Sequence, residues 1–301
     1  MNPLLTFWKF TRPHTIIGSV VGILTLYFVV CEKPETQCVS YLIMALCIGI
    51  STNIFIVGIN QIADVAIDKI NKPYLPIASG ALSVPHAKLI VLTALLISLG
   101  LALYISPYLF AIIALATTIG WAYSMPPFHL KKHHITAALS ITLVRGVLLN
   151  AGGFIVFNYL VNHTLTMPEN VKILTLFIIA FSIVISWFKD LPDIEGDAQY
   201  HIQTFAILYS PKVALIAGNL LVGLAYVFTI YMKYIDYVLS DSPSFKTKTL
   251  LFGHLLLLVL FIINAFSIKL NEHLSIQKFY KRFWWFFFAE YLLYLVAYVV
   301  K

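Results

Sequence analysis

Two short stretches of the chain contain six of its 13 acidic residues, and each stretch follows a long apolar run. The acids are Asp64 and Asp68 in "NQIADVAID", and Asp190, Asp193, Glu195 and Asp197 in "DLPDIEGDA". Carboxylates beside hydrocarbon are costly unless they are paired or bind a metal ion. The two stretches are therefore candidates for a site that binds a cation. The alternative is that they are ordinary solvated loop acids.

The spacing of these side chains indicates which ion would fit. Asn60, Asp64 and Asp68 are four residues apart, whereas Asp190, Asp193 and Asp197 are three and then four apart. Each set lies on one face if its helix persists, and like charges at that spacing repel. A few carboxylates that leave positions for water and phosphate suit Mg²⁺ better than Ca²⁺. We interpret the stretches as two halves of a magnesium site.

A magnesium site open to phosphate needs cations and hydrogen-bond donors for the rest of the anion. The stretch "WAYSMPPFHLKKHH" contains Tyr123 and Lys131, Lys189 directly precedes the second acidic stretch, and Arg12 begins the first apolar span. We expect these four residues to contact the anion. The alternative is that the basic residues contact lipid headgroups or solvent.

Arg145 lies about ten residues into an apolar span, which corresponds to roughly 15 Å of helical rise. An arginine at that depth faces a protein or water-filled interior, or it extends outward at some cost. We expect it to point inward, with a diphosphate or the acidic stretches as its partner. Asn150 follows on the same helix, and Gly146, Gly152 and Gly153 allow close helix packing.

These side chains must be positioned by helices that cross a membrane. Of the 301 residues, 60% are hydrophobic and only 11% are charged, with a mean hydropathy of +0.89, whereas soluble domains carry about 25% charged residues. The apolar stretches suit helices of about 20 residues and lack the alternation of barrel strands. We predict an all-α integral membrane protein, with residues 1–301 forming one domain around a central cavity.

We predict nine spans, at about residues 13–31, 40–62, 86–105, 107–124, 135–161, 171–190, 211–232, 249–269 and 282–300. Lys and Arg number 13 on the side of the N-terminus and the acidic stretches, and six, including Lys33 and Lys301, on the other side. The positive-inside rule places the more basic side in the cytoplasm. This asymmetry explains most of the net charge of +7, which gives no reason to invoke nucleic acid.

Three further features bear on location and packing. The N-terminal stretch "MNPLLTFWKFTRPHT" has neither a signal-peptide pattern nor a Ser- and Arg-rich leader, so we expect a bacterial plasma membrane or an organelle-encoded equivalent. Cys31 and Cys38 flank an outer loop and form either a disulfide or two thiols. Six aromatic residues in the last span are interpreted as an interface belt: Phe283, Trp284, Trp285, Phe286, Phe287 and Phe288.

The sequences that follow the two acidic stretches are alike. "ALSVPHAKLIVLTALL" and "ILYSPKVALIAGNLL" each contain a Ser, a Pro and a Lys before a span. This pattern indicates two copies of one helix-loop-helix unit that face each other across a central cavity. Acids at a repeat interface also occur in cation transporters, which remain an alternative function.

"NQIADVAIDKINKPYLPIASG" and "KDLPDIEGDAQY", with "YSMPP" between them, resemble the signatures of the UbiA-type intramembrane prenyltransferase superfamily. Within it, "FWKFTRPHTIIGS", "NKPYLPIASG", "VRGVLLNAGGF" and "KDLPDIEGD" are similar to the homogentisate prenyltransferases of tocopherol and prenylquinone synthesis, which use phytyl, geranylgeranyl or solanesyl donors. The resemblance covers the chain from Phe7 to about Phe205.

The resemblance implies roles for individual residues. Two Mg²⁺ ions would bridge a prenyl diphosphate, one held by Asn60, Asp64 and Asp68 and the other by Asp193 and Asp197. The diphosphate would be bound by Arg12, Tyr123, Lys131, Arg145 and Lys189, and we assign catalytic roles to Asp190 and Arg145. Asp190 is the candidate for the base that accepts the ring proton.

The implied reaction transfers a prenyl group to a small aromatic acceptor within the lipid bilayer. When its charge is neutralised, the diphosphate departs more easily and leaves an allylic carbocation. An electron-rich aromatic carbon then attacks this cation in a cavity that excludes water. The expected acceptor is homogentisate, which loses CO₂ during coupling. Alternatives with the same chemistry are 4-hydroxybenzoate, a dihydroxynaphthoate and a chlorophyllide-like alcohol.

Overall fold

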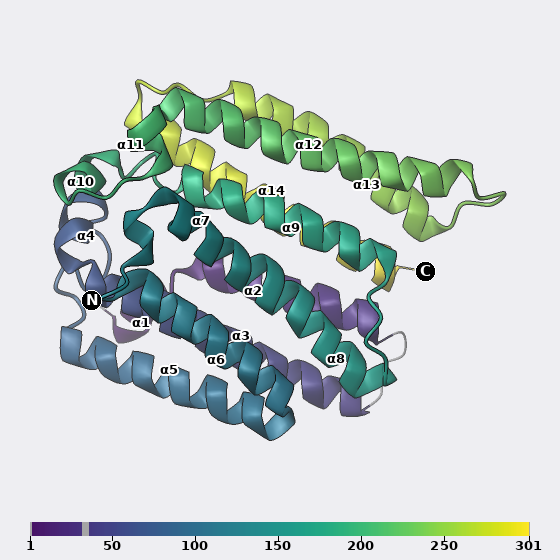
Figure 1. The fold of residues 1–301 in the computed structure, drawn as a ribbon, viewed down its shortest axis with the longest axis horizontal. Helices are drawn as coiled ribbons and strands as arrows, with labels where there is room; N and C mark the ends of the chain where they lie inside the picture. Colours follow the sequence, from purple (N-terminus) through teal and green to yellow (C-terminus); the bar gives the residue numbers. More distant parts are fainter. Residues whose placement is uncertain (1, 32–35, 301) are drawn as a thin grey trace.

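The computed structural model describes residues 2–31 and 36–300, and this part of the chain contains helices and loops but no strand. Lys33 and Lys301, used in the charge count above, lie outside it. The helices that run along the bundle are α2 (Pro13–Val30), α3 (Thr36–Ala63), α5 (Val84–Ile105), α6 (Pro107–Ser124), the continuous α7 (His134–Thr142), η2 (Leu143–Gly152) and α8 (Gly153–Asn162), α9 (Glu169–Phe188), α12 (Pro211–Val238), α13 (Phe245–Phe266) and α14 (His273–Val299). The chain passes along the bundle nine times in this described part, so its two termini lie at opposite ends (Figure 1).

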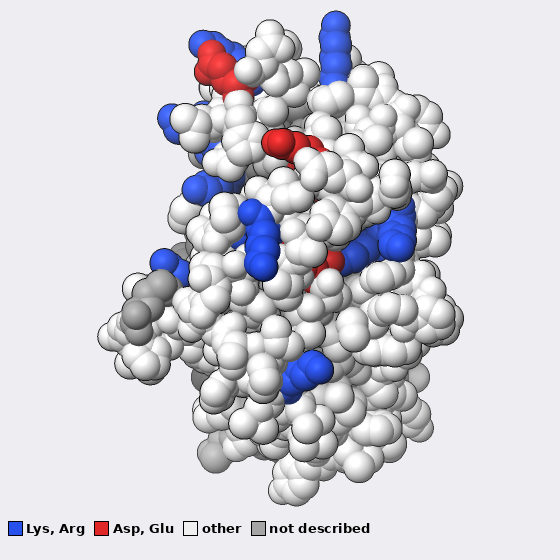
Figure 2. All heavy atoms as spheres, turned by 90° about the vertical axis from the view of Figure 1, so that its left-hand side faces the viewer, with Lys and Arg blue, Asp and Glu red and all other residues white. Residues whose placement is uncertain are grey.

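One end of the bundle carries the short helices, and we call it the motif end. These helices are α1 (Pro3–Phe10), α4 (Val65–Asn71), η1 (Leu130–Lys132), α10 (Ile194–Gln199) and α11 (Phe205–Tyr209). Figure 1 shows α4 and α10 side by side there, and the two helices are in contact. Figure 2 views the same end directly and shows Lys and Arg side chains spread over it, with acidic side chains among them. The motif end is therefore the basic end that the charge count placed in the cytoplasm.

The starts of several helices follow from local sequence. Ser106 and Ser210 precede prolines and accept hydrogen bonds from the backbone N–H groups of Tyr108 and Val213. Ser244 accepts in the same way at the start of α13. Side-chain oxygens at the N-cap satisfy donors that have no partner within the helix, and proline fits the first helical turn. These caps fix where the spans begin.

Eight of the predicted spans are confirmed as helices long and apolar enough to cross a membrane. The ninth, α14, has 27 residues and begins at His273, nine residues earlier than predicted from the apolar run. It falls outside the set of eight because tyrosines, tryptophans and charged residues such as Lys281 and Glu290 lower its hydropathy. The all-α membrane fold is confirmed, while the predicted start of this span was wrong.

Helix α9 forms the core of the bundle. In its most apolar window 67% of the residues are buried, whereas no other of the eight spans exceeds 39%. Helices α12 and α13 lie on one side of the bundle, with α12 packed against α9 and α13 against α14 (Figure 1). A cavity lies on the other side of α9, and its lining residues come mainly from α2, α3, α6, α7–η2–α8 and α14. Helix α9 thus separates α12 and α13 from the cavity.

The two cysteines that could have formed an outer disulfide, Cys31 and Cys38, are both buried thiols in the described part of the chain. The loop between them lies mostly outside the described residues.

A buried polar pair joins α13 to α14 away from the cavity. His254 Nε2 lies 3.0 Å from Glu290 Oε1, and both side chains are fully buried. His254 Nδ1 also contacts the carbonyl oxygen of Leu250, so both ring nitrogens have partners. Removing one member of such a pair leaves the other buried without a partner.

Replacing His254 with Leu is therefore expected to lower the free energy of unfolding by about 3–5 kcal/mol. A denaturant titration in mixed micelles measures it. Glu272→Leu is the matched control, because it disrupts the exposed Lys269–Glu272 pair, and exposed pairs contribute little. The double variant His254→Leu, Glu290→Leu is expected to recover much of the loss. Equal stability of His254→Leu and Glu272→Leu would contradict this role.

Candidate functional site

The first acidic stretch lies where α3 ends and α4 begins. Asp64 stands between the two helices with φ −101° and ψ 14°, outside the usual helical region. The backbone bonds from Asp64 to Asn60 and from Asp68 to Asp64 are nevertheless kept, at 2.9 and 2.7 Å. Asn60 Nδ2 donates to Asp64 Oδ2 at 2.8 Å and lies 3.3 Å from Ser124 Oγ of α6. The three residues thus follow one another on successive turns through a bend.

The second stretch repeats this geometry between α9 and α10. Asp193 precedes α10 with φ −105° and ψ 3°, close to the values of Asp64, and the N–H of Asp197 donates to its carbonyl at 3.0 Å. Helix α9 ends at Phe188, so one continuous helix does not carry this set of acids. Pro192 follows four residues later, and proline does not fit a helix interior. Asp64–Asp68 and Asp193–Asp197 are therefore equivalent pairs in the two halves.

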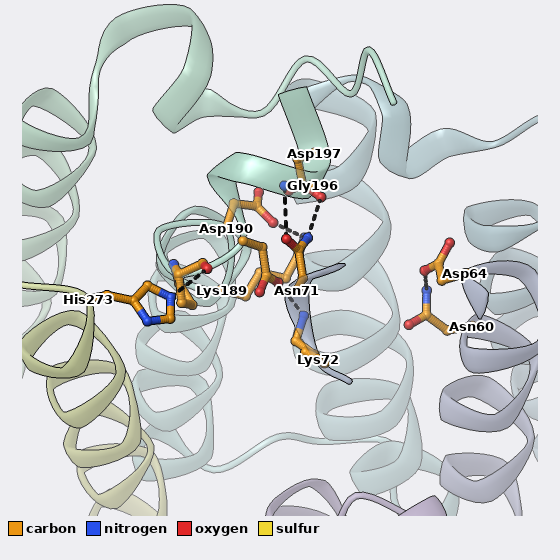
Figure 3. A network of polar contacts seen from close by, with 11 residues as sticks. Asn60, Asp64, Asn71, Lys72, Lys189, Asp190, Gly196, Asp197 and His273 are labelled. Atoms are coloured by element: carbon orange, nitrogen blue, oxygen red, sulfur yellow. Dashed lines mark hydrogen bonds and ion pairs between the residues drawn. The ribbon is translucent and has the colours of Figure 1, made fainter. Parts of the chain in front are cut away.

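The two halves are joined by direct contacts between α4 and α10 (Figure 3). The N–H of Gly196 donates to Asn71 Oδ1 at 2.9 Å, and Asn71 Nδ2 donates to Asp197 Oδ1 at 3.4 Å. Lys72 Nζ forms an ion pair with Asp193. We call the contacts of Asn71 with Gly196 and Asp197 the amide clasp. The clasp and the ion pair hold the carboxylates of the second stretch beside the first.

Further cations surround the acids. Lys131 of η1 pairs with Asp64, and Lys189 pairs with Asp190. Tyr123, at the end of α6, lies next to Lys189. The segment that carries Lys131 is anchored by Gln203, whose N–H and carbonyl bond the backbone of Lys132 and His134 at 2.8 and 3.0 Å. The structure therefore brings Tyr123, Lys131 and Lys189 to the acids.

Arg12 reaches the same place from the turn between α1 and α2. It precedes Pro13 and has a positive φ of 50°. Gln61 Nε2 donates to the carbonyl of Phe10 at 2.7 Å, which ties this turn to α3. The charge of Arg12 is close enough to Asp68 to favour its ionised form. Arg12 thus lies on the first half of the site.

Three carboxyl groups of the site have raised pKa values. Burial raises the pKa of Asp190, although the charge of Lys189 opposes the rise. Burial raises the pKa of Asp68 to about 6, although Arg12 and Lys72 oppose the rise. Burial and the nearby charge of Asp190 raise the pKa of Asp197 to about 7. Burial and crowding with like charges both disfavour the ionised form. A divalent cation between these carboxylates would instead favour their ionised forms.

The donor set fits Mg²⁺ that also binds phosphate. Within the described residues, no three His, Cys, Asp or Glu side chains gather closely enough to hold one metal ion by themselves. Mg²⁺ commonly uses one or two protein carboxylates and completes its shell with water and substrate phosphates. The paired acids Asp64 and Asp68, and Asp193 and Asp197, match that pattern.

The acids lie at the mouth of a cavity of about 1110 Å³. Asp64, Asp190 and Asp197 line it at the motif end, whereas Tyr27 and Phe157 line its far end, near the opposite ends of α2 and α8. Its walls are mostly aliphatic and aromatic side chains. The site thus joins a charged mouth to a long apolar chamber.

Arg145 lies inside the cavity, apart from the acids. Its guanidinium carbon is 5.0 Å from the ring centroid of Trp284 and 5.3 Å from that of Phe287. No ion pair links it to any acid in the described chain. Asn150 is engaged elsewhere: it donates to Thr175 Oγ1 at 2.8 Å and accepts from the Tyr291 hydroxyl at 2.9 Å. Arg145 points inward as expected, but its neighbours are aromatic rings.

Sequence reasoning missed several contributors. Asn71 and Lys72 were passed over, although Lys72 follows Asp68 by one helical turn. The interpretation of the last aromatic span as an interface belt was wrong for five of its six residues. Phe283, Phe286 and Phe288 are buried, as are Trp284 and Phe287, which line the cavity. Their spacing with Tyr291, three and seven residues, marks one helix face and could have indicated this.

Comparisons with known proteins identify the family to which this chain is similar. A family model described as the UbiA prenyltransferase family matches residues 16–287. A homogentisate phytyltransferase of Synechocystis sp. is 35% identical, with 99% of this chain and 96% of that protein covered. A homogentisate geranylgeranyltransferase of Hordeum vulgare is 32% identical, over 97% of this chain and 72% of its own.

Two more distant likenesses bear on acceptor and fold. A naringenin 8-dimethylallyltransferase of Sophora flavescens is 31% identical, over 97% of this chain and 72% of its own. A solved UbiA homolog of Archaeoglobus fulgidus, bound to DMAPP and Mg²⁺, superposes with a TM-score of 0.64 at 16% identity, covering 95% of this chain and 99% of its own. The relatives thus include more than one kind of aromatic acceptor.

Proposed function

The chain belongs to the UbiA prenyltransferase family, and on that premise we propose that it transfers a prenyl group from a prenyl diphosphate to homogentisate, with loss of CO₂. The observation that carries this proposal is the pair of Asp-rich halves, joined across α4 and α10, at the mouth of an apolar cavity. The 35% identity to a homogentisate phytyltransferase over nearly the whole chain supports the acceptor. We treat residues 1–301 as a single catalytic domain.

The diphosphate lies at the motif end in this proposal. Asn60, Asp64 and Asp68 would hold one Mg²⁺, and Asp193 and Asp197 a second. Bound there, the ions neutralise charge on the departing diphosphate. Lys131 and Lys189, which now pair with acids of the two halves, would turn to phosphate oxygens, with Arg12 and Tyr123 beside them. Charge-assisted bonds of this kind are strong and directional.

The cavity accommodates the donor tail and protects the reactive cation. A phytyl or geranylgeranyl chain has only apolar surface, which matches the aliphatic and aromatic walls. Water would trap an allylic carbocation. The residues that exclude water from the cavity therefore favour prenyl transfer over hydrolysis of the donor. The two chain types are those named for the relatives from Synechocystis and Hordeum.

The allylic C–O bond breaks and its electron pair leaves with the diphosphate, and a ring carbon of the acceptor forms the new C–C bond. The ring proton passes to Asp190, which we propose as the base because it is buried and lines the cavity mouth. The bond between the methylene and carboxylate carbons breaks, CO₂ leaves, and the methylene carbon takes up a proton.

An acceptor panel tests the proposal. Protein in liposomes is supplied with Mg²⁺, phytyl or geranylgeranyl diphosphate, and each of homogentisate, 4-hydroxybenzoate, dihydroxynaphthoate and a chlorophyllide, and products are identified by mass spectrometry. We expect a prenylated methylquinol from homogentisate, and its loss on adding EDTA. A product from another acceptor alone would assign that acceptor instead.

Two further points follow from the family. The cation-transport alternative loses its support, since the acids lie at the end of the bundle rather than midway along it. We place the protein as a multi-pass enzyme in a bacterial plasma membrane, with the basic motif end in the cytoplasm. Labelling of single-cysteine variants in intact cells, at Ser83 and Asp241, tests this orientation, because these exposed residues lie at opposite ends of the bundle.

A further inference from the structure

Arg145 is a cationic side chain in the cavity with a hydrogen-bonding group left unused. Its Nη1 is buried and has no hydrogen-bond partner among the described residues. The guanidinium lies over the faces of Trp284 and Phe287. A buried donor without a partner is costly, and stacking on aromatic rings leaves the edge of the guanidinium open for an anion.

The π-helical segment η2 explains why this arginine faces α14. Arg145 and Asn150 are five residues apart, which would separate them by about 140° around an α-helix. In η2 the hydrogen bonds run between residues five apart, so both side chains face α14. There Arg145 meets Trp284 and Phe287, while Asn150 accepts from Tyr291. The bonds of Asn150 to α9 and α14 fix the segment that carries Arg145.

Arg145 lies deeper than the diphosphate position. Its neighbour Gly146 packs against Ile179 of α9 so closely that an added Cβ would lie 2.7 Å from Ile179 Cγ1. Ile179 is nine residues before the end of α9 at Phe188, a helical rise of about 14 Å. The second acidic stretch begins beyond that end. The backbone that carries Arg145 is therefore about 14 Å along α9 from the start of the second acidic stretch.

We propose that Arg145 is the acceptor-specificity residue: its guanidinium binds the carboxylate of the aromatic acceptor and places the ring between the aromatic side chains of α14 and the donor. The inference rests on the proposed function, because it assumes a carboxylate-bearing acceptor. It replaces the sequence-based assignment of Arg145 to the diphosphate.

Three observations favour a carboxylate over the diphosphate as the partner. The motif end already supplies Arg12, Lys72, Lys131 and Lys189 to an anion at the acids. Arg145 is separated from that cluster along the helices, as described above. A planar guanidinium matches a carboxylate with two parallel hydrogen bonds, and the rings beneath it suit an aromatic ligand.

Binding measurements on the full-length protein test the inference. Arg145→Met is compared with wild type, using homogentisate as one ligand and an unreactive geranylgeranyl thiolodiphosphate with Mg²⁺ as the other. The homogentisate Kd is expected to rise about tenfold to a hundredfold, with the thiolodiphosphate Kd unchanged. Arg145→Lys keeps the positive charge but lacks the planar guanidinium that can donate two parallel hydrogen bonds. Its homogentisate Kd is expected to lie between those of wild type and Arg145→Met. Arg282→Met, an exposed arginine of α14, is the matched control.

If Arg145→Met binds the thiolodiphosphate more weakly and homogentisate as well as wild type does, Arg145 is a diphosphate ligand and the inference is overturned. Unchanged binding of both ligands would also overturn it. Methylhydroquinone has the same ring without the carboxylate. It should therefore bind equally well to wild type and to Arg145→Met. Wild-type protein that neither binds nor converts homogentisate would overturn the proposed acceptor, and the inference with it.

Discussion

Replacing Asp68 or Asp193 with Asn is expected to lower kcat/KM for prenyl transfer by about a hundredfold to a thousandfold. The amide keeps the volume of the side chain but loses the charge that would hold Mg²⁺ against the diphosphate. Both side chains are buried at the motif end, so no solvated acid can replace them. The measurement is the rate of prenylated quinol formation at saturating Mg²⁺, together with Mn²⁺ binding followed by EPR.

A control and a double variant make this prediction specific. Asp241→Asn removes an exposed acid at the opposite end of the bundle and is expected to leave the rate unchanged. The double variant Asp68→Asn, Asp193→Asn is expected to be about as slow as the slower single variant, because in the proposed function the two halves act on one diphosphate. Full activity in either single variant would contradict the two-ion arrangement.

The spans could be predicted from the sequence because hydropathy is a local property. The start of α14 could not, since Lys278, Lys281 and Arg282 interrupt the apolar pattern there. In the structure these residues occupy the first turns of α14, at the motif end. Long basic side chains reach water from such positions without ending the helix. A rule based on apolar runs therefore places the start of this helix too late.

The acids of the site could also be predicted, because their types and spacing carry the chemistry. The contacts that position them could not. Asn71 and Asp197 are 126 residues apart, and Lys72 and Asp193 are 121 apart. The partners of Asn71 and Lys72 are defined only once α4 and α10 pack together. The depth of Arg145 was readable from its span, but its aromatic neighbours come from α14, far along the chain.

The amide clasp gives the second prediction with a large expected effect. Replacing Gly196 with Ala is expected to lower kcat about a hundredfold, because small displacements of reacting groups have effects of that size. An added Cβ would lie 2.6 Å from Cγ of Asn71, whose side chain cannot move away without losing its bonds to Gly196 and Asp197. The measurements are single-turnover rates and Mn²⁺ binding, both expected to fall.

Variants of Asn71 separate loss of the clasp from crowding. Asn71→Ala removes both hydrogen bonds without adding bulk, and is expected to lower kcat to a similar extent as Gly196→Ala. Because both changes remove the same contacts, the double variant should be no slower than either single one. Gly100→Ala is the control, since an added Cβ there meets no atom within 4 Å. A fast Asn71→Ala enzyme beside a slow Gly196→Ala enzyme would assign the effect to crowding at α10, and the two halves would then be held together by the Lys72–Asp193 pair.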